Sequence, residues 1–279
     1  WRFQHQTVMR IQAGQDIRQQ GLNWKIGHAD IVGADPRVCP SRMWWRVITG
    51  DHRGSRLRRY NNVMELIDIG ANLGHESFDQ DLPEVLDRAR AAGVVQMLIT
   101  GASREGSPKA LHIAQQHPEF LYATAGVHPH HAVEYTQECD LEMRALHQHA
   151  EVVAVGECGL DYFRDLSPRP AQRRAFELQL QLAVDIQKPL FLHQRDAHED
   201  FMAMMKNFEG KLGKAVVHCF TGSKKELFEY LDADYYIGIT GWLCDERRGL
   251  HLREMVANIP SNRLMIETDS PYLMPRSIK

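Results

Sequence analysis

The 279-residue sequence has no long apolar run. None approaches the roughly 18 residues that a membrane-spanning helix requires, so we expect no membrane partner. The N-terminal part also lacks the apolar core of about 7–15 residues that a signal peptide contains. Cysteine is scarce, and its five residues are scattered and odd in number, which argues against a disulfide framework and favours the reduced cytoplasm. Nothing in the pattern indicates a subunit interface, so we expect a monomer.

An excess of basic charge is missing from most of the chain. Residues 64–279 hold 22 Lys and Arg against 32 Asp and Glu, whereas residues 1–63 hold 11 against 4. A protein that binds many phosphates of a duplex needs a broad basic surface, which the longer region lacks. The basic first region shows no period of 2 or 3.6 residues. We interpret residues 1–63 as a poorly ordered extension or as non-native upstream sequence, with a nucleic-acid-binding arm as the alternative.

From Met64 onward, short apolar runs alternate regularly with amphipathic stretches. Eight runs are nearly continuous, as expected of parallel strands covered on both faces: residues 65–69, 96–100, 121–127, 152–156, 189–192, 215–217, 235–240 and 264–267. The stretches between them are typical of helices: residues 82–92, 105–116, 141–150, 171–186, 198–208, 224–231 and 250–258. This alternation predicts an α/β protein with a (β/α)8 TIM-barrel fold over residues 64–279. No room is left for an eighth helix, so we expect a barrel that is incomplete at its C-terminus.

Polar side chains follow most of the predicted strands, at the end where barrel enzymes carry their active sites. Glu157, His193, His218 and Asp269 lie at the ends of the fourth, fifth, sixth and eighth runs. Imidazole and carboxylate groups together bind Zn, Mn, Fe or Mg ions, so these four residues are the predicted metal ligands. Alternatively, each histidine is a satisfied core residue and each acid a cap or salt-bridge partner. Four strand ends that all offer ligand types argue against that alternative.

A second group of side chains is suited to an anionic substrate. His128 and His130 flank a proline after the third run, and Arg195, Arg247 and Arg248 offer planar donors to phosphate oxygens. We predict that these five residues bind substrate. The alternatives are loop histidines without a role and a solvated charged loop around the last two arginines.

Seven motifs together resemble the TatD-type metal-dependent deoxyribonucleases, and most closely the TatD branch. The motifs are IDIGANL (67–73), AGVHPH (125–130), VGECGLD (155–161), FLHQRDA (191–197), VHCFTG (217–222), GITGWLCDERRG (238–249) and IETDSPY (266–272). The similarity covers residues 64–276 without a long gap. It implies a TIM-barrel hydrolase that digests single-stranded DNA or RNA from the 3′ end, in DNA repair or turnover. The implied cofactor is Mg²⁺ or a similar divalent ion, such as Mn²⁺ or Zn²⁺.

By motif match, Glu157, His193, His218 and Asp269 take the family's metal-ligand positions, and His128 falls where the family places a phosphate contact. These assignments give a hypothesis for the reaction. One or two divalent ions hold a phosphate oxygen and activate a water, with Glu157 bridging them. Asp269 accepts the proton from the water, and His128 stabilises the developing charge. Glu157, Asp269 and His128 are therefore the predicted catalytic residues.

The sequence departs from many relatives at the first strand, where those proteins carry a metal-binding His-x-His pair. Gly70 and Asn72 occupy these positions here, as they do in the TatD branch. Asn72 is therefore a candidate first-strand contact, and one ion or two remain open. The family also continues beyond residue 279 with a last helix, so we expect the chain to be truncated.

Two other interpretations of the barrel stay open. An amidohydrolase-type enzyme acting on a small molecule would use the same scaffold. Such enzymes usually add a His-x-His pair and often a metal-bridging lysine, and neither stands at a matching place. The missing pair and the missing last helix also suggest a non-catalytic remnant barrel, against which the four retained ligands argue. The acidic balance of residues 64–279 favours an exonuclease that holds a few nucleotides at an end.

Overall fold

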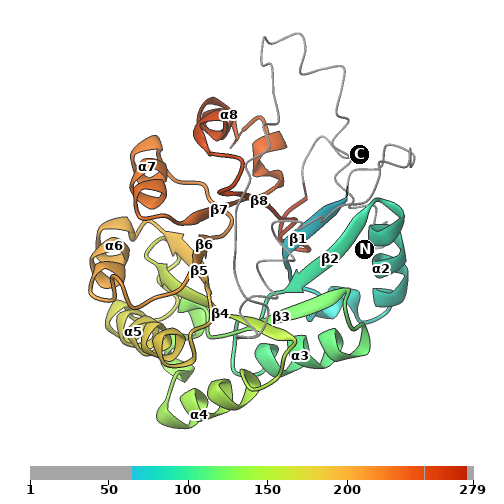
Figure 1. Ribbon diagram of the computed structural model, residues 1–279, viewed down its shortest axis with the longest axis horizontal. Helices are drawn as coiled ribbons and strands as arrows, with labels where there is room; N and C mark the ends of the chain where they lie inside the picture. Colours follow the sequence, from blue (N-terminus) through green and yellow to red (C-terminus); the bar gives the residue numbers. More distant parts are fainter. Residues whose placement is uncertain (1–64, 248, 275–279) are drawn as a thin grey trace, which may run out of the picture.

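The computed structural model describes residues 65–247 and 249–274, which form a single eight-stranded sheet. The strands pair in chain order, each parallel to the next, and curve into a nearly closed barrel (Figure 1). They are β1 (Leu66–Ala71), β2 (Val94–Ile99), β3 (Leu121–Ala125), β4 (Val152–Asp161), β5 (Leu190–Arg195), β6 (Ala215–Val217), β7 (Tyr236–Ile239) and β8 (Leu264–Ile266). The predicted TIM-barrel fold is confirmed. The expectation for residues 1–63 lies outside the described residues.

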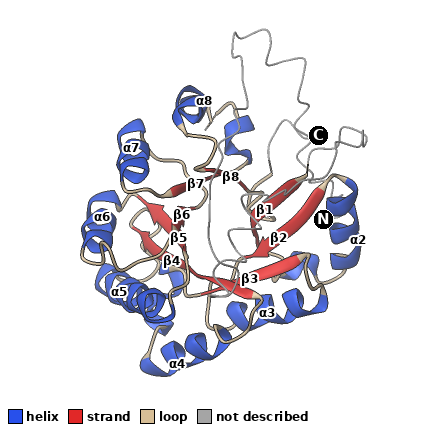
Figure 2. Ribbon diagram, viewed as in Figure 1, coloured by secondary structure: helices blue, strands red, loops and turns tan. Residues whose placement is uncertain are grey.

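Helices surround the barrel, one α-helix between each pair of successive strands (Figure 2). They are α2 (Leu82–Ala91), α3 (Gly106–Gln116), α4 (Gln137–Leu146), α5 (Arg169–Ile186), α6 (His198–Lys206), α7 (Lys224–Asp232) and α8 (Leu250–Met255). Short 3-10 helices are η2 (Glu76–Phe78), η3 (Pro129–Glu134), η4 (Gly241–Cys244) and η5 (Val256–Asn258). Within the described residues no helix follows β8, and none is long and apolar enough to cross a membrane.

Two elements differ clearly from their predicted bounds. β4 continues five residues past the predicted end at 156, because residues 158–161 pair in register with residues 192–195 of β5. α4 begins at Gln137 instead of 141, because the Thr136 side chain accepts a hydrogen bond from the Cys139 backbone N–H and caps the helix earlier. The strand extension matters for function, since it carries the chain from Glu157 to Asp161 along the barrel mouth.

The barrel interior is closed by a layer of buried side chains, one from each strand. Its members are Ile69, Leu98, Tyr122, Ala154, Phe191, Val216, Tyr236 and Met265. Successive side chains of a strand point to opposite faces, so the residue two positions later points inward again, nearer the strand's carboxyl end. That rule places His193 two positions above Phe191, and His218 two positions above Val216. The apolar layer is therefore the floor of the candidate site, and the Phe191 ring stacks on that of His218 at 4.6 Å.

The junction between β8 and β1 is held differently from the other strand pairs. Among the described residues, the strand pairing here is reduced to an isolated bridge between Ala71 and Ser270. Asp68 in β1 adds side-chain bonds: it accepts hydrogen bonds from the Thr268 backbone N–H at 3.0 Å and the Thr268 hydroxyl at 2.7 Å. The backbone N–H of Asp269 also donates to the Gly70 carbonyl at 2.8 Å. We call residues 68–72 and 268–270 the seam.

Candidate active site at the barrel mouth

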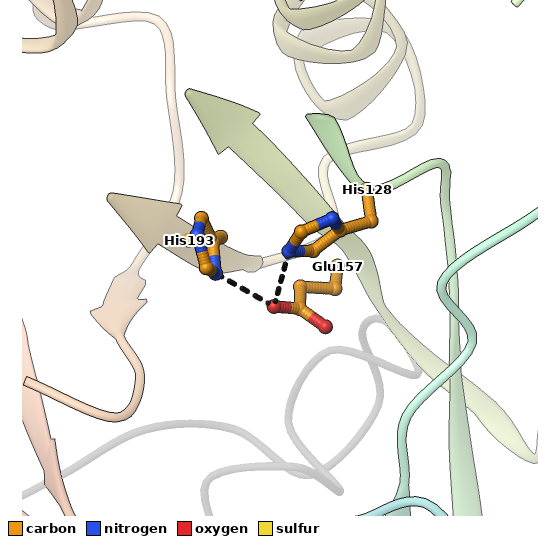
Figure 3. A group of neighbouring side chains, drawn as sticks. All are labelled: His128, Glu157 and His193. Carbon is orange, nitrogen blue, oxygen red and sulfur yellow. Dashed lines mark hydrogen bonds and ion pairs between the residues drawn. The ribbon is translucent and has the colours of Figure 1, made fainter. Parts of the chain in front are cut away.

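The Glu157 carboxylate is the centre of a buried cluster of three histidines. Its Oε1 atom lies 2.6 Å from His218 Nε2, 3.0 Å from His193 Nδ1 and 3.4 Å from His128 Nε2. Figure 3 shows the carboxylate between the rings of His128 and His193. Glu157 and His193 lie within β4 and β5, and His128 and His218 follow β3 and β6, so residues up to 90 positions apart in the sequence meet at one point. The structure therefore brings together three of the four predicted metal ligands and adds His128.

The charges inside this cluster depend on one another. Burial alone would raise the pKa of the Glu157 carboxyl, but the nearby His218 and His128 rings hold it well below its usual range. Burial opposes the charged form of His218, yet Glu157 and Glu267 raise its pKa well above the usual value. His128 behaves oppositely: burial lowers its pKa well below the usual value. The site thus holds an ionised carboxylate and a neutral imidazole side by side.

Asp269, the fourth predicted ligand, lies on the seam side of the mouth. Asn72 Nδ2 donates a hydrogen bond to its Oδ1 at 3.0 Å, so the predicted first-strand contact serves to orient this carboxylate. Burial raises the Asp269 pKa to about 6. No bond joins Asp269 directly to Glu157 among the described residues.

Glu267 is a site residue that sequence analysis missed. It is 2% exposed, its Oε1 accepts a hydrogen bond from the Cys219 backbone N–H at 2.5 Å, and its Oε2 lies 3.4 Å from His218 Nδ1. This Oε2 also lies too close to where a Cβ at position 70 would be, so any side chain there would require Glu267 to shift. The glycine at the usual first-histidine position therefore makes room for a buried acid. The position of Glu267 directly after an apolar strand is typical of a site residue, but the motif match assigns the metal-ligand position to Asp269.

Asp161, also missed, joins two of the histidines. Its Oδ2 lies 2.9 Å from His130 Nε2 and 3.2 Å from His193 Nε2, and its side chain is 1% exposed. Burial would raise the pKa of this carboxyl, but its hydrogen bonds with His130 and His193 hold it below its usual range. His130, predicted to bind substrate, is thus held by Asp161; its ring also packs against His128 at 4.2 Å, but it makes no bond to Glu157 among the described residues. Asp161 orients the His193 ring by holding the nitrogen that faces away from Glu157.

The three arginines predicted to bind substrate differ in the residues that they contact. Arg195 places its guanidinium carbon 3.9 Å from the centre of the Phe163 ring. Arg247 is held by Asp245, whose Oδ2 lies 3.0 Å from its Nη2. Arg248 lies outside the described residues. Of the two predicted arginines that the structure describes, Arg195 is therefore better placed to bind a substrate phosphate, because Arg247 is held by Asp245.

The donor set fits a divalent cation. His128, Glu157 and His193 each offer one ligand atom, and these atoms lie within 4.8 Å of one another. Imidazole nitrogen and carboxylate oxygen are suitable ligands for zinc and manganese, and the carboxylates also suit magnesium. His218 Nδ1 and Glu267 Oε2 are buried, face each other at 3.4 Å and make no other bond among the described residues.

Comparison with known proteins agrees with this architecture. Residues 67–279 match the sequence model of a family described as TatD related DNase. A 3′-5′ ssDNA/RNA exonuclease TatD from Edwardsiella piscicida is 50% identical over 214 residues, 77% of this chain and 82% of that protein. The protein of the same name from Enterobacter lignolyticus (strain SCF1) is 52% identical over 213 residues, 76% of this chain and 82% of its own length.

Among solved structures, a TatD homolog from Escherichia coli K12, YJJV, superposes with a TM-score of 0.67 at 30% identity. The match covers 74% of this chain and 79% of that one. The barrel derived above therefore has a counterpart of known structure.

Proposed function

Because the chain belongs to the TatD related DNase family, we propose that it hydrolyses phosphodiester bonds of single-stranded DNA or RNA from the 3′ end with a divalent metal ion. One observation carries the proposal: the Glu157 carboxylate is surrounded by three imidazoles at the open end of the barrel. Two relatives at 50–52% identity are named as 3′-5′ exonucleases for single-stranded DNA and RNA. The acidic balance of residues 64–279 favours action at strand ends over binding along a duplex.

Glu157, His193 and His218 would hold the ion, with Asp269 as a further ligand. A divalent ion supplies Lewis acidity, which activates water and neutralises phosphate charge. Glu157 contributes the anionic ligand, because its neighbours keep it ionised. We propose Mg²⁺ as the physiological ion, one or two per molecule, and Mn²⁺ and Zn²⁺ as the ions to compare, since imidazole nitrogens suit both.

The remaining side chains orient the substrate and the proton acceptor. Asp269, held by Asn72, is the proposed proton acceptor for the attacking water. His128 is proposed to contact the phosphate through Nε2, as a neutral ring that donates a hydrogen bond to developing charge. We further propose a cytoplasmic monomer that acts in DNA repair or turnover. The four described cysteines are free, which agrees with a reducing compartment.

The experiment is nucleotide release from single-stranded oligonucleotides labelled at either end, with each ion and with a chelator. We expect release from the 3′ end only when a divalent ion is present. Glu157→Gln should lower the rate by at least about 100-fold and reduce bound metal, because losing a ligand costs no less than losing a residue that orients one. Glu84→Gln, on the exposed surface of α2, is the matched control and should change neither.

Release that persists in chelator, or wild-type rates in Glu157→Gln, would contradict the proposal. A folded, metal-loaded protein that releases nothing from DNA or RNA would instead favour the remnant-barrel interpretation.

A further inference from the structure

The rim of the barrel next to the histidine cluster carries an exposed aromatic ring. Phe163 lies two residues after the end of β4 and is 57% exposed. The Arg195 guanidinium covers the ring at 3.9 Å from its centre, so the opposite face and the edge account for the exposure. Among the described residues, no carboxylate is paired with Arg195. An aromatic face and an unpaired arginine therefore lie together at the mouth.

Strand geometry places this pair beside the metal-binding cluster. Arg195 lies two positions after His193 on β5, so both side chains leave the strand on the same face, with Arg195 nearer the mouth. From the pair Cys158 and Leu192, β4 and β5 keep their register up to the pair Asp161 and Arg195, and the Tyr162 backbone N–H donates to the Arg195 carbonyl at 2.9 Å. The Phe163 ring and the Arg195 guanidinium therefore lie just beyond His193, nearer the outer edge of the barrel mouth.

Hydrogen bonds hold the Phe163 loop in a fixed position relative to His193. Asp161 Oδ1 accepts hydrogen bonds from the backbone N–H groups of Phe163 at 3.0 Å and Arg164 at 2.8 Å. The other oxygen of the same carboxylate contacts His193 Nε2. One buried side chain therefore positions both the metal-binding ring and the exposed ring.

The rest of the loop is equally constrained. The Gln172 side chain accepts a hydrogen bond from the Asp161 N–H and donates to the carbonyls of Asp161 and Ser167. The Ser167 hydroxyl donates to the His130 carbonyl at 2.8 Å. An exposed ring on a rigid loop loses little conformational entropy when it binds a ligand.

We propose that Phe163 and Arg195 form a nucleobase-binding subsite for the end of a single strand. An unpaired base stacks on the open face of Phe163, and the edge of the Arg195 guanidinium donates hydrogen bonds to a neighbouring phosphate. Stacking on an aromatic ring accepts every base and requires an unpaired one, which matches a sequence-tolerant exonuclease. The inference rests on the proposed nuclease function and adds how the strand is held.

The test uses Phe163→Ala and two single-stranded oligonucleotides, one normal and one with abasic residues at its last three 3′ positions. Affinity is measured in chelator by fluorescence anisotropy, so binding is read without hydrolysis, and KM and kcat are measured with metal. Phe163→Ala should weaken binding and raise KM for the normal strand by about 5- to 100-fold, with kcat nearly unchanged. The abasic strand should bind wild type and variant equally weakly. Phe163→Trp should restore the preference for the normal strand.

Phe228→Ala is the matched control. Phe228 is 40% exposed and lies beneath Lys224 Nζ at 5.9 Å, but it belongs to α7 on the outside of the barrel. This control should behave as wild type on both strands. Equal losses for normal and abasic strands in Phe163→Ala, or no loss on the normal strand, would overturn the subsite. Absent hydrolysis in wild type would count against the nuclease function alone, because the anisotropy comparison still tests the subsite.

Discussion

Two sides of the barrel mouth are joined in different ways. Between β4 and β5 the backbone ladder extends from the pair Val155 and Leu190 to the pair Asp161 and Arg195, close to the metal-binding cluster, with one irregularity between Val155 and Cys158. At the seam the backbone offers a single isolated bridge, and the Asp68 side chain takes over much of the bonding. The first side is positioned mainly by backbone and the second mainly by side chains. Substitutions should therefore have different consequences on the two sides.

Asp68 at the seam and Asp161 at the end of β4 are both buried carboxylates, and their pKa values shift in opposite directions. Burial raises the pKa of Asp68 to about 7, despite its bonds with Thr268 and Gly70. Asp161 is also buried, but its hydrogen bonds with His130 and His193 hold its pKa below the usual range. Neighbouring groups thus outweigh burial at Asp161, whereas burial dominates at Asp68. Asp68 is suited to holding structure, and Asp161 to orienting charged groups at the site.

The largest effect is expected from Asp68→Ala at the seam. The substitution leaves the Gly70 N–H, the Thr268 N–H and the Thr268 hydroxyl without their acceptor in a buried place. The free energy of unfolding should fall by roughly 2–4 kcal/mol, measured by urea denaturation. Asp87→Ala, whose side chain is 80% exposed on α2, is the control and should change little. A loss below about 1 kcal/mol would mean that the seam does not depend on Asp68.

On the other side, Asp161→Asn should affect metal binding more than folding. Asparagine keeps the shape but offers one acceptor oxygen where Asp161 uses two, so either the histidines or the loop N–H groups lose a partner. Metal affinity by calorimetry and the rate of nucleotide release should each fall about 10- to 100-fold.

Asp165→Asn serves as the control for this position. Asp165 lies in the same loop but pairs with Arg169 at the surface. Unchanged metal affinity in Asp161→Asn would show that the His193 ring needs no partner on its outer nitrogen.

The prediction that is sharpest in sign is the pH dependence of Asp68→Asn, whose effect is small at each single pH step. In the unfolded chain Asp68 ionises near its ordinary pKa of 3.8, whereas in the folded chain it holds its proton up to about pH 7. Its contribution to stability is therefore complete below pH 3.8 and is lost as pH rises to about 7. Relative to wild type, Asp68→Asn should gain up to about 1.4 kcal/mol per pH unit in this window.

Urea denaturation of both proteins at pH 5, 6 and 7 measures this difference. The comparison cancels other titrating groups, including His147, whose pKa burial lowers to about 3 and whose effect on stability has the opposite sign. A constant difference, or one that shrinks as pH rises, would contradict the raised pKa of Asp68.

The pattern of apolar and polar residues along the sequence was sufficient to predict the strands, the helices and part of the candidate site. Parallel strands covered on both faces are nearly uniformly apolar, so their ends were visible in the sequence. Glu157, His193 and His218 stand directly after such runs and converge in the structure. Asp161 escaped notice because β4 extends beyond its apolar run, and nothing local predicts the register with β5 that carries it there.

The sequence alone determined the order and type of the elements, since the spacing of apolar residues sets which face of each strand or helix is buried. It also determined which strand ends carry ligand-type side chains. Only the tertiary structure decided which of those side chains meet. The approach of Glu267 to Gly70, the pairing of Asp68 with Thr268 and the stacking of Arg195 on Phe163 depend on how strands distant in sequence pack and align. These contacts join elements through space, and periodicity along one segment carries no information about them.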